Sequence, residues 1–117
     1  MWYMGEVDPD GKDRNEPGAK LDAGKPRAGL VLGDFSLGLI EVAKVGTFGA
    51  IKYSDHGWLS VPNGIARYTD AMVRHWLKEA AGEVYDDDSE LLHSAHLAWN
   101  ALARLELIIR ERNETKD

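Results

Sequence analysis

Residues 33–51 read GDFSLGLIEVAKVGTFGAI, and this stretch decides the fold class. Asp34 can accept a hydrogen bond from a free amide of a first helical turn, so it predicts the start of a helix. Beyond it, apolar side chains recur on almost every helical face, and the charges before Ile51 are Glu41 and Lys44. A helix that is apolar on most faces is buried centrally. Because a chain of 117 residues has few helices to surround it, we expect subunits to associate.

Two further helices are predicted, over about residues 65–83 and 88–112. The first follows a turn-rich loop that carries Trp58. The second starts at the capping pair Asp88-Ser89 and has an apolar stripe at helical spacing. This stripe consists of Leu91, Leu92, Ala95, Trp99, Leu102, Leu105 and Ile109. No alternating strand of useful length and no internal repeat occurs, so the predicted fold class is all-α.

The N-terminal residues 1–29 differ in composition from the rest of the chain. They contain six acids, five bases and five glycines, and almost nothing that could fill a core. Such a composition is typical of an extended or partly disordered arm, and we expect its order to depend on a ligand or a neighbouring subunit. The predicted organisation is an arm over 1–29, an all-α domain over 30–112 and a solvated tail over 113–117.

The composition argues against several classes of protein. Acids outnumber bases 20 to 14, for a net charge of −6, whereas proteins that bind nucleic acid normally show a basic face. The chain has no cysteine, which excludes disulfides, thiolate metal sites and thiol nucleophiles. No apolar run approaches the roughly 20 residues that span a bilayer, and the first residues lack the pattern of a signal peptide. We therefore expect a cytoplasmic protein without a nucleic-acid or membrane partner.

The densest polar feature is a run of carboxylates without any base between them. Its members are Glu79, Glu83, Asp86, Asp87, Asp88 and Glu90. Like charges this close repel one another unless a cation or solvent relieves them. Hard divalent cations such as Mg²⁺ prefer carboxylate oxygens together with substrate phosphates. The alternative is an acidic, solvated turn whose charges favour the start of the next helix.

Polar side chains on the two helices flank this run. Ser89, His93, His96 and Asn100 would share one helical face, beside the apolar stripe. Histidines at this spacing can share a metal or bind phosphate, although a hydrogen-bond ladder between helices is the structural alternative.

The preceding helix and the loops add further polar and aromatic groups. His75, Glu79 and Glu83 form a row toward the acidic turn, and Arg67, Arg74 and Lys78 form either a solvated face or a polyphosphate site. No folding reason calls for Lys20, Asp22 and Lys25 in the arm. Near Lys52, the aromatic side chains of Tyr53 and Trp58 suit a nucleobase. The sequence has no phosphate-binding glycine motif and no nucleophile elbow.

Together these residues resemble a known family, the phage dATP/dGTP diphosphohydrolases. These are MazZ-type, MazG-like members of the all-α nucleoside-triphosphate pyrophosphatases. The resemblance spans about residues 18–110 and rests on motifs in the same order. They are GAKLDAGKPR at 18–27, FGAIKY at 48–53, Trp58, Arg74-His75, Gly82-Glu83, Asp86, Asp88-Ser89 and His93-x-x-His96.

The resemblance implies a MazG-like helical bundle with an extended N-terminal arm, whose core is completed by oligomerisation. It also implies metal-dependent hydrolysis of dGTP and dATP to the monophosphates and pyrophosphate. In phages with 2-aminoadenine DNA, the dGMP formed in the host cytoplasm feeds synthesis of the modified base. Members of the wider superfamily are dimers or tetramers with active sites between helices of neighbouring subunits.

On this basis we assign roles to the candidate residues. Glu83, Asp86, His93 and His96 are the predicted ligands of Mg²⁺, with Mn²⁺ or Co²⁺ as alternatives. Glu79 and His75 are the catalytic candidates, either as a further ligand or to orient water. The predicted substrate-binding residues are Lys20, Lys25, Lys52 and Arg74 for phosphate, Tyr53 and Trp58 for base or sugar, Asp22 for a guanine edge, and Asn100.

The chain departs from the family pattern at two places. The family has glycine after the Asp-Ser pair, where this chain has Glu90. MazG proteins typically pair E-x-x-E on one helix with E-x-x-D on the next, and here His93 and His96 take the latter places. The alternative functions are a pyrophosphatase for pyrimidine nucleotides such as dUTP or dCTP, a non-catalytic nucleotide-binding module, and a small helical adaptor.

Overall fold

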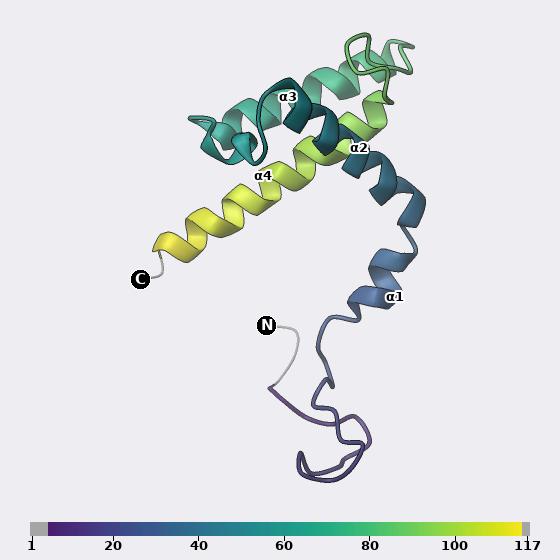
Figure 1. Cartoon of the computed structure of the whole chain (residues 1–117), viewed down its shortest axis with the longest axis vertical. Coiled ribbons are helices and arrows are strands. Elements are labelled where there is room, and N and C mark those ends of the chain that lie inside the picture. Colours follow the sequence, from purple (N-terminus) through teal and green to yellow (C-terminus); the bar gives the residue numbers. More distant parts are fainter. Residues whose placement is uncertain (1–4, 116–117) are drawn as a thin grey trace. The chain divides into compact units, whose positions relative to one another are not determined.

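The structure, a computed structural model, describes residues 5–115. Within them, the secondary structure is helical except for one isolated antiparallel β-bridge between Tyr85 and Leu92. Figure 1 shows the helices in chain order. The predicted all-α class is confirmed. The chain divides into two compact units, Met1–Phe35 and Ser36–Asp117.

The first unit contains most of the predicted arm and the short helix α1 (Ala28–Gly33). Before α1 the chain folds into a series of turns, and the Ala23 N–H donates to the Val7 carbonyl at 2.8 Å. The Asp8 carboxylate is buried among these turns and accepts hydrogen bonds from backbone N–H groups. Residues 1–4 of the predicted arm lie outside the described residues.

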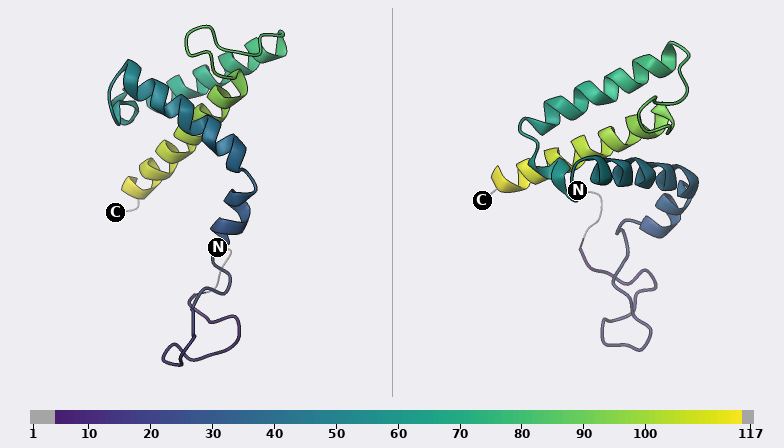
Figure 2. Two further views of the ribbon diagram at one scale, coloured as in Figure 1. Left: turned by 45° about the vertical axis from the view of Figure 1, so that its right-hand side comes forward. Right: turned by 45° about the horizontal axis from the view of Figure 1, so that its top comes forward.

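The second unit contains three long helices, α2 (Ser36–Lys52), α3 (Gly64–Ala80) and α4 (His93–Thr115), and the 3₁₀ helix η1 (Gly57–Ser60). Figures 1 and 2 show α3 lying alongside α4 while α2 crosses α4. Since a loop joins the end of α3 directly to the start of α4, these two helices run antiparallel. Polar residues of both helices meet where α3 packs against α4.

The helix predicted from Asp34 begins later than expected. Asp34 follows the last residue of α1 with φ −65° and ψ −18°, and its N–H bonds to the Leu32 carbonyl. The prediction that Asp34 starts the long helix is therefore wrong, and α2 begins at Ser36. Sequence alone could not separate the two, because an Asp residue favours the start of a helix whether or not a short helix precedes it.

The prediction that α2 is buried centrally is wrong for the single chain. Its one buried side chain is Val45, and Leu37 and Ile51 are each 81% exposed. Helix α2 contacts α4 at Gly46, where the lack of a side chain lets Trp99 approach the backbone closely. A Cβ on Gly46 would lie 3.1 Å from the Trp99 Nε1 atom. The apolar faces of α2 that do not meet α4 have no cover within residues 36–115.

Helix α4 starts four residues later than the predicted Asp88-Ser89 cap. The loop after α3 folds back on itself: Asp86 N–H donates to the Leu91 carbonyl at 2.8 Å, and His93 N–H donates to the Val84 carbonyl at 3.0 Å. Glu90 interrupts the helical path with φ +62°. At its other end α4 continues to Thr115, through the first part of the predicted tail; Lys116 and Asp117 lie outside the described residues.

None of the helices among residues 5–115 combines the length and apolar character that crossing a membrane requires.

Candidate metal and nucleotide site

Three histidines meet between α3 and α4. His75 lies in the second half of α3, His93 is the first residue of α4, and His96 follows one turn later. The His75 ring stacks on the His96 ring with centroids 4.4 Å apart and planes 11° apart. Its Nδ1 atom lies 2.8 Å from the Nδ1 atom of His93. His93 is fully buried, so the protein itself must satisfy both of its ring nitrogens.

Glu83 satisfies the second nitrogen of His93. Its Oε2 atom lies 2.6 Å from His93 Nε2. A carboxylate can only accept, so Nε2 carries the proton, and a neutral His93 then has a bare Nδ1 atom that faces His75. Glu83 thus selects the tautomer of His93 that directs a lone pair toward the centre of the cluster.

Asp86 is positioned by the loop that precedes α4. Its Oδ2 atom accepts the Ser89 N–H at 2.8 Å, and its carbonyl accepts the Glu90 N–H at 2.8 Å. Ser89 also joins this turn to α4, because its Oγ atom lies 2.6 Å from His96 Nε2 and accepts the Leu91 N–H at 3.1 Å. Ser89 was predicted to lie on the helix, but it belongs to the loop before α4. It still contacts His96, because this loop folds back over α4.

The protonation states in the cluster suit cation binding. Burial, together with the charges of His96 and His93, lowers the pKa of His75 to about 4. Burial also lowers the pKa of His96. Burial alone would raise the pKa of Asp86, but hydrogen bonds from Ser89 and the nearby histidines outweigh it, and the net shift is downward. At neutral pH, His75 and His96 are therefore neutral, each with one unprotonated ring nitrogen, next to an ionised carboxylate.

His75, Asp86 and His93 form a potential metal-binding group. One ligand atom from each lies within 4.8 Å of the other two. Asp86 and His93 were among the four predicted ligands, whereas His75 was predicted as catalytic. Of the other two predicted ligands, Glu83 contacts the group through His93, and His96 Nε2 lies 3.9 Å from Asp86 Oδ2.

Two predicted polar residues lie next to the histidines. Glu79, one turn after His75 on α3, accepts a hydrogen bond from the Ser94 hydroxyl on α4. Sequence reasoning missed Ser94, because nothing in its local pattern indicates a partner on another helix. Asn100 is buried, and its Nδ2 atom donates to the His96 carbonyl at 2.8 Å. Its observed contact is thus to the backbone of the helix that carries His96.

Lys52, at the end of α2, contacts the acidic loop, which is the segment 81–92 between α3 and α4. Its ammonium group forms an ion pair with Asp88, and this hydrogen bond raises the pKa of Lys52. The ammonium also lies 5.7 Å from the Phe48 ring centroid and 5.5 Å from that of Tyr53. Phe48 in turn makes an edge contact with His96. The structure therefore brings Lys52 and Tyr53 to the same end of the bundle as the histidines.

Trp58 belongs to an aromatic cluster. Its ring centroid lies 6.2 Å from that of Tyr68 and 5.8 Å from that of Trp99, all in edge arrangements. The Tyr68 hydroxyl donates to the Trp58 carbonyl at 2.7 Å. These contacts hold η1 against α3 and α4.

Arg74 is exposed on α3 beside His75 and forms no ion pair with any residue of the described range.

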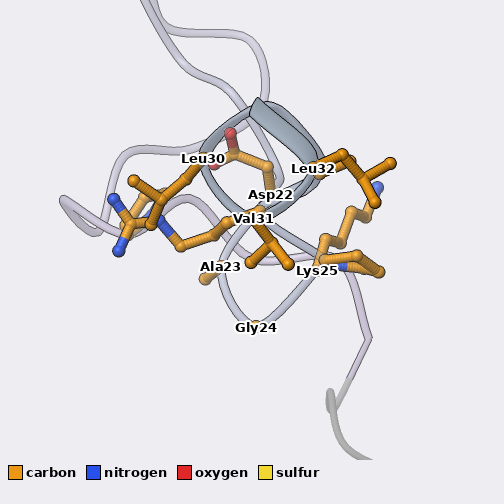
Figure 3. Close-up of a pocket in the computed structure, with 11 residues that line it drawn as sticks. Asp22, Ala23, Gly24, Lys25, Leu30, Val31 and Leu32 are labelled. Carbon is orange, nitrogen blue, oxygen red and sulfur yellow. The ribbon is translucent and has the colours of Figure 1, made fainter. Parts of the chain in front are cut away.

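The predicted arm residues lie in the first unit. Asp22 and Lys25 line an open pocket of about 890 Å³, with Arg27 and the apolar side chains of α1 (Figure 3). Lys25 also pairs with Glu6 at 3.3 Å. The side chain of Lys20 is not part of the pocket wall, but its backbone N–H is bound by Asp8.

The comparisons with known proteins support the resemblance noted in the sequence. No curated protein and no solved structure matches the chain. One family does, described as dATP/dGTP diphosphohydrolase, N-terminal, and its match covers residues 15–117. This range includes both helices of the histidine cluster and the loop between them. The chain therefore belongs to the dATP/dGTP diphosphohydrolase family, enzymes that act on deoxypurine nucleotides.

Proposed function

We propose that this domain hydrolyses dGTP and dATP to dGMP and dAMP with release of pyrophosphate, and that it uses a divalent metal bound by His75, Asp86 and His93. The family supplies the reaction and the substrates. The observation that supports a metal site is that three ligand atoms lie within 4.8 Å of one another. Two imidazoles and a carboxylate match the donor preference of Mn²⁺ or Co²⁺ better than that of Mg²⁺, which prefers oxygen.

The residues around these ligands keep them in position. Glu83 holds His93 by its Nε2–H, and Ser89 holds the Asp86 carboxylate. Such outer partners orient ligands and raise their basicity. A bound divalent metal would neutralise the charge that develops on the phosphate oxygens during attack by water. His96 stacks on His75 next to the three ligands and is proposed as a further ligand or as a phosphate contact.

Glu79 is the proposed residue that orients the attacking water. It lies one turn from His75 on α3, and Ser94 holds its carboxylate from α4. A carboxylate in this position can accept a proton from the attacking water. His75, the other catalytic candidate, is better placed as a ligand because it belongs to the group of three.

Lys52 and Arg74 are the proposed phosphate contacts of the helical unit. Lys52 would exchange Asp88 for a phosphate oxygen, which an exposed ion pair permits because such pairs contribute little free energy. Arg74 is exposed and offers a bidentate fork. Tyr53, beside Lys52, is proposed to contact the base or sugar, and Trp58 to support that loop.

The arm is proposed to contribute Lys20, Asp22 and Lys25 as contacts to the nucleotide. Asp22 and Lys25 already line one pocket with Arg27, so an acceptor for a base edge and cations for phosphate lie together. Asp22 is assigned to a guanine edge, where a carboxylate can accept two hydrogen bonds.

A homo-oligomer is proposed as the working form. Leu37 and Ile51 of α2 are each 81% exposed, and Leu105 and Ile109 of α4 are 52% and 46% exposed. Monomeric proteins rarely leave so many large apolar side chains of their main helices exposed to water, and a second copy offers an equally apolar surface. Light scattering after size exclusion should give a dimer or tetramer, and Leu37→Glu with Ile51→Glu should reduce it to the monomer.

The proposed setting is phage purine deoxynucleotide metabolism in the host cytoplasm, where dGMP supplies synthesis of 2-aminoadenine DNA. This part rests on the family resemblance. It predicts that dGTP is a better substrate than any pyrimidine nucleotide.

Product analysis by chromatography tests the reaction. The eight common ribo- and deoxyribonucleoside triphosphates are each incubated with Mg²⁺, Mn²⁺ or Co²⁺. We expect monophosphate and pyrophosphate from dGTP and dATP. Preferred turnover of dUTP or dCTP would establish the pyrimidine alternative. Binding of a slowly hydrolysed dGTP analogue in calorimetry, without turnover of any nucleotide, would establish a non-catalytic binding module.

A further inference from the structure

A short N-terminal segment outside the family match is bonded to the proposed substrate-binding loop. The family match begins at residue 15, yet three consecutive earlier residues reach into residues 20–25. Glu6 pairs with the Lys25 ammonium at 3.3 Å, the Val7 carbonyl accepts the Ala23 N–H at 2.8 Å, and Asp8 Oδ2 accepts the Lys20 N–H at 2.7 Å. We call these three residues the clasp.

Asp8 is the central residue of the clasp. It is 4% exposed, and it is the one buried residue within residues 5–35. Its Oδ1 atom accepts the Asp10 N–H at 2.7 Å, while Oδ2 reaches across twelve positions to Lys20. The hydrogen bond from the Lys20 N–H, helped by that from Asp10, lowers the pKa of Asp8 despite its burial. Asp8 is therefore a charged anchor, and hydrogen bonds to charged groups are stronger than those between neutral ones.

The loop held by the clasp is the part of the arm that carries the proposed substrate contacts. Asp22 N–H donates to the Lys20 carbonyl at 3.0 Å, and Lys25 N–H donates to the Asp22 carbonyl at 3.1 Å. These turns are local, so without an external anchor they give the loop no fixed path. Figure 3 shows Asp22, Ala23, Gly24 and Lys25 along the wall of the pocket.

We infer that Asp8 is a positioning residue for substrate binding: with Glu6 and Val7, it holds residues 20–25 in their binding conformation before the nucleotide arrives. This inference rests on the proposed substrate role of the arm. A loop that is ordered in advance loses less conformational entropy on binding, which raises affinity without changing the chemical step. Asp8 acts through the backbone of residues 20–25, so the expected effect is on KM.

Asp8→Asn tests the inference, with Asp10→Asn as the matched control. Both variants remove one negative charge from the same segment, but the exposed Asp10 carboxylate accepts no hydrogen bond within the described chain. Hydrogen exchange of the full chain is measured without nucleotide. We expect the Lys20 amide of Asp8→Asn to exchange about tenfold faster or more, as loss of a charged hydrogen bond implies, with amides of α3 and α4 unchanged.

Kinetics on the same proteins give the second measurement. For Asp8→Asn we expect KM for dGTP to rise about tenfold at unchanged kcat, and for Asp10→Asn neither to change. Unchanged exchange at Lys20, or faster exchange with an unchanged KM, would overturn the inference. Lys25→Ala separates the two levels: if it also leaves KM unchanged, the failure lies in the proposed substrate role of the arm, and if it raises KM, the failure lies in the clasp.

Discussion

The Nδ1 atoms of His75 and His93 face each other at 2.8 Å across the contact between α3 and α4. Two imidazole nitrogens this close can share a proton or bind a common cation, but they cannot do both. Burial lowers the pKa of His75 to about 4, so proton competition at neutral pH comes only from the shared hydrogen bond. If both Nδ1 atoms bind one metal, the proton between them must therefore move to His75 Nε2, because a neutral imidazole can change tautomer without losing its proton.

Substitutions in the acidic loop should separate a metal ligand from the residue that orients one. Asp86→Asn should lower kcat/KM for dGTP about 10³-fold, because it removes a ligand of a group that supplies several kcal/mol of charge stabilisation. Glu83→Gln should cost about 10- to 100-fold and raise the metal concentration needed, since Glu83 acts through His93.

Asp87→Asn is the control for these two variants, because Asp87 is an exposed neighbour with the same charge. It should retain wild-type activity, and circular dichroism should show unchanged helix content in all three proteins. Equal losses for Glu83→Gln and Asp86→Asn would instead make Glu83 a direct ligand, as the sequence analysis proposed.

The metal requirement should reflect the imidazole-rich ligand set. Activity should disappear after treatment with a chelator and return at lower concentrations of Mn²⁺ or Co²⁺ than of Mg²⁺, because imidazole binds the transition metals more tightly. The measurement is pyrophosphate release against free metal concentration. His75→Gln should weaken the response to Mn²⁺ more than the response to Mg²⁺; full activity in the presence of the chelator would contradict the site.

The metal-free domain should lose stability as the pH falls from about 6.5 to about 4. The pKa of His75 is lowered from 6.5 to about 4, so within this window the unfolded chain binds more protons than the folded chain, and protonation favours unfolding. Above pH 6.5 His75 is neutral in both the folded and the unfolded chain, and it causes no such loss of stability. Urea unfolding with chelator at several pH values measures it.

His75→Gln should show a shallower loss of stability over the same window, because glutamine does not titrate. The remaining slope would include His96, whose pKa is lowered in the same direction. Identical slopes for the wild type and the variant would show that His75 does not carry the effect.

Glu90 should be a point of backbone strain. Its φ of +62° lies in the left-handed region that side chains with a Cβ disfavour. Glu90→Gly should stabilise the domain by about 1 kcal/mol. Thermal unfolding measures the change, and Glu90→Ala, which removes the same charge but keeps a Cβ, should not stabilise. Equal effects of the two substitutions would point to charge instead of strain.

The sequence by itself determined the helices and much of the chemistry. Apolar spacing predicted α2, α3 and most of α4, because a helix places residues three and four apart on one face whatever lies opposite. For the same reason the proximity of His93, His96 and Asn100 on one helix could be predicted. The family resemblance was confirmed over residues 15–117.

Only the tertiary structure decided which of these groups meet. The contact of His75 with His93, of Glu83 with the far side of His93, and of Ser94 with Glu79 depends on the register of α3 against α4. That register is set by the loop between the helices, whose backbone bonds and left-handed Glu90 have no periodic pattern. Periodicity describes the faces of a helix, whereas the pairing of two faces depends on packing between residues distant in the chain.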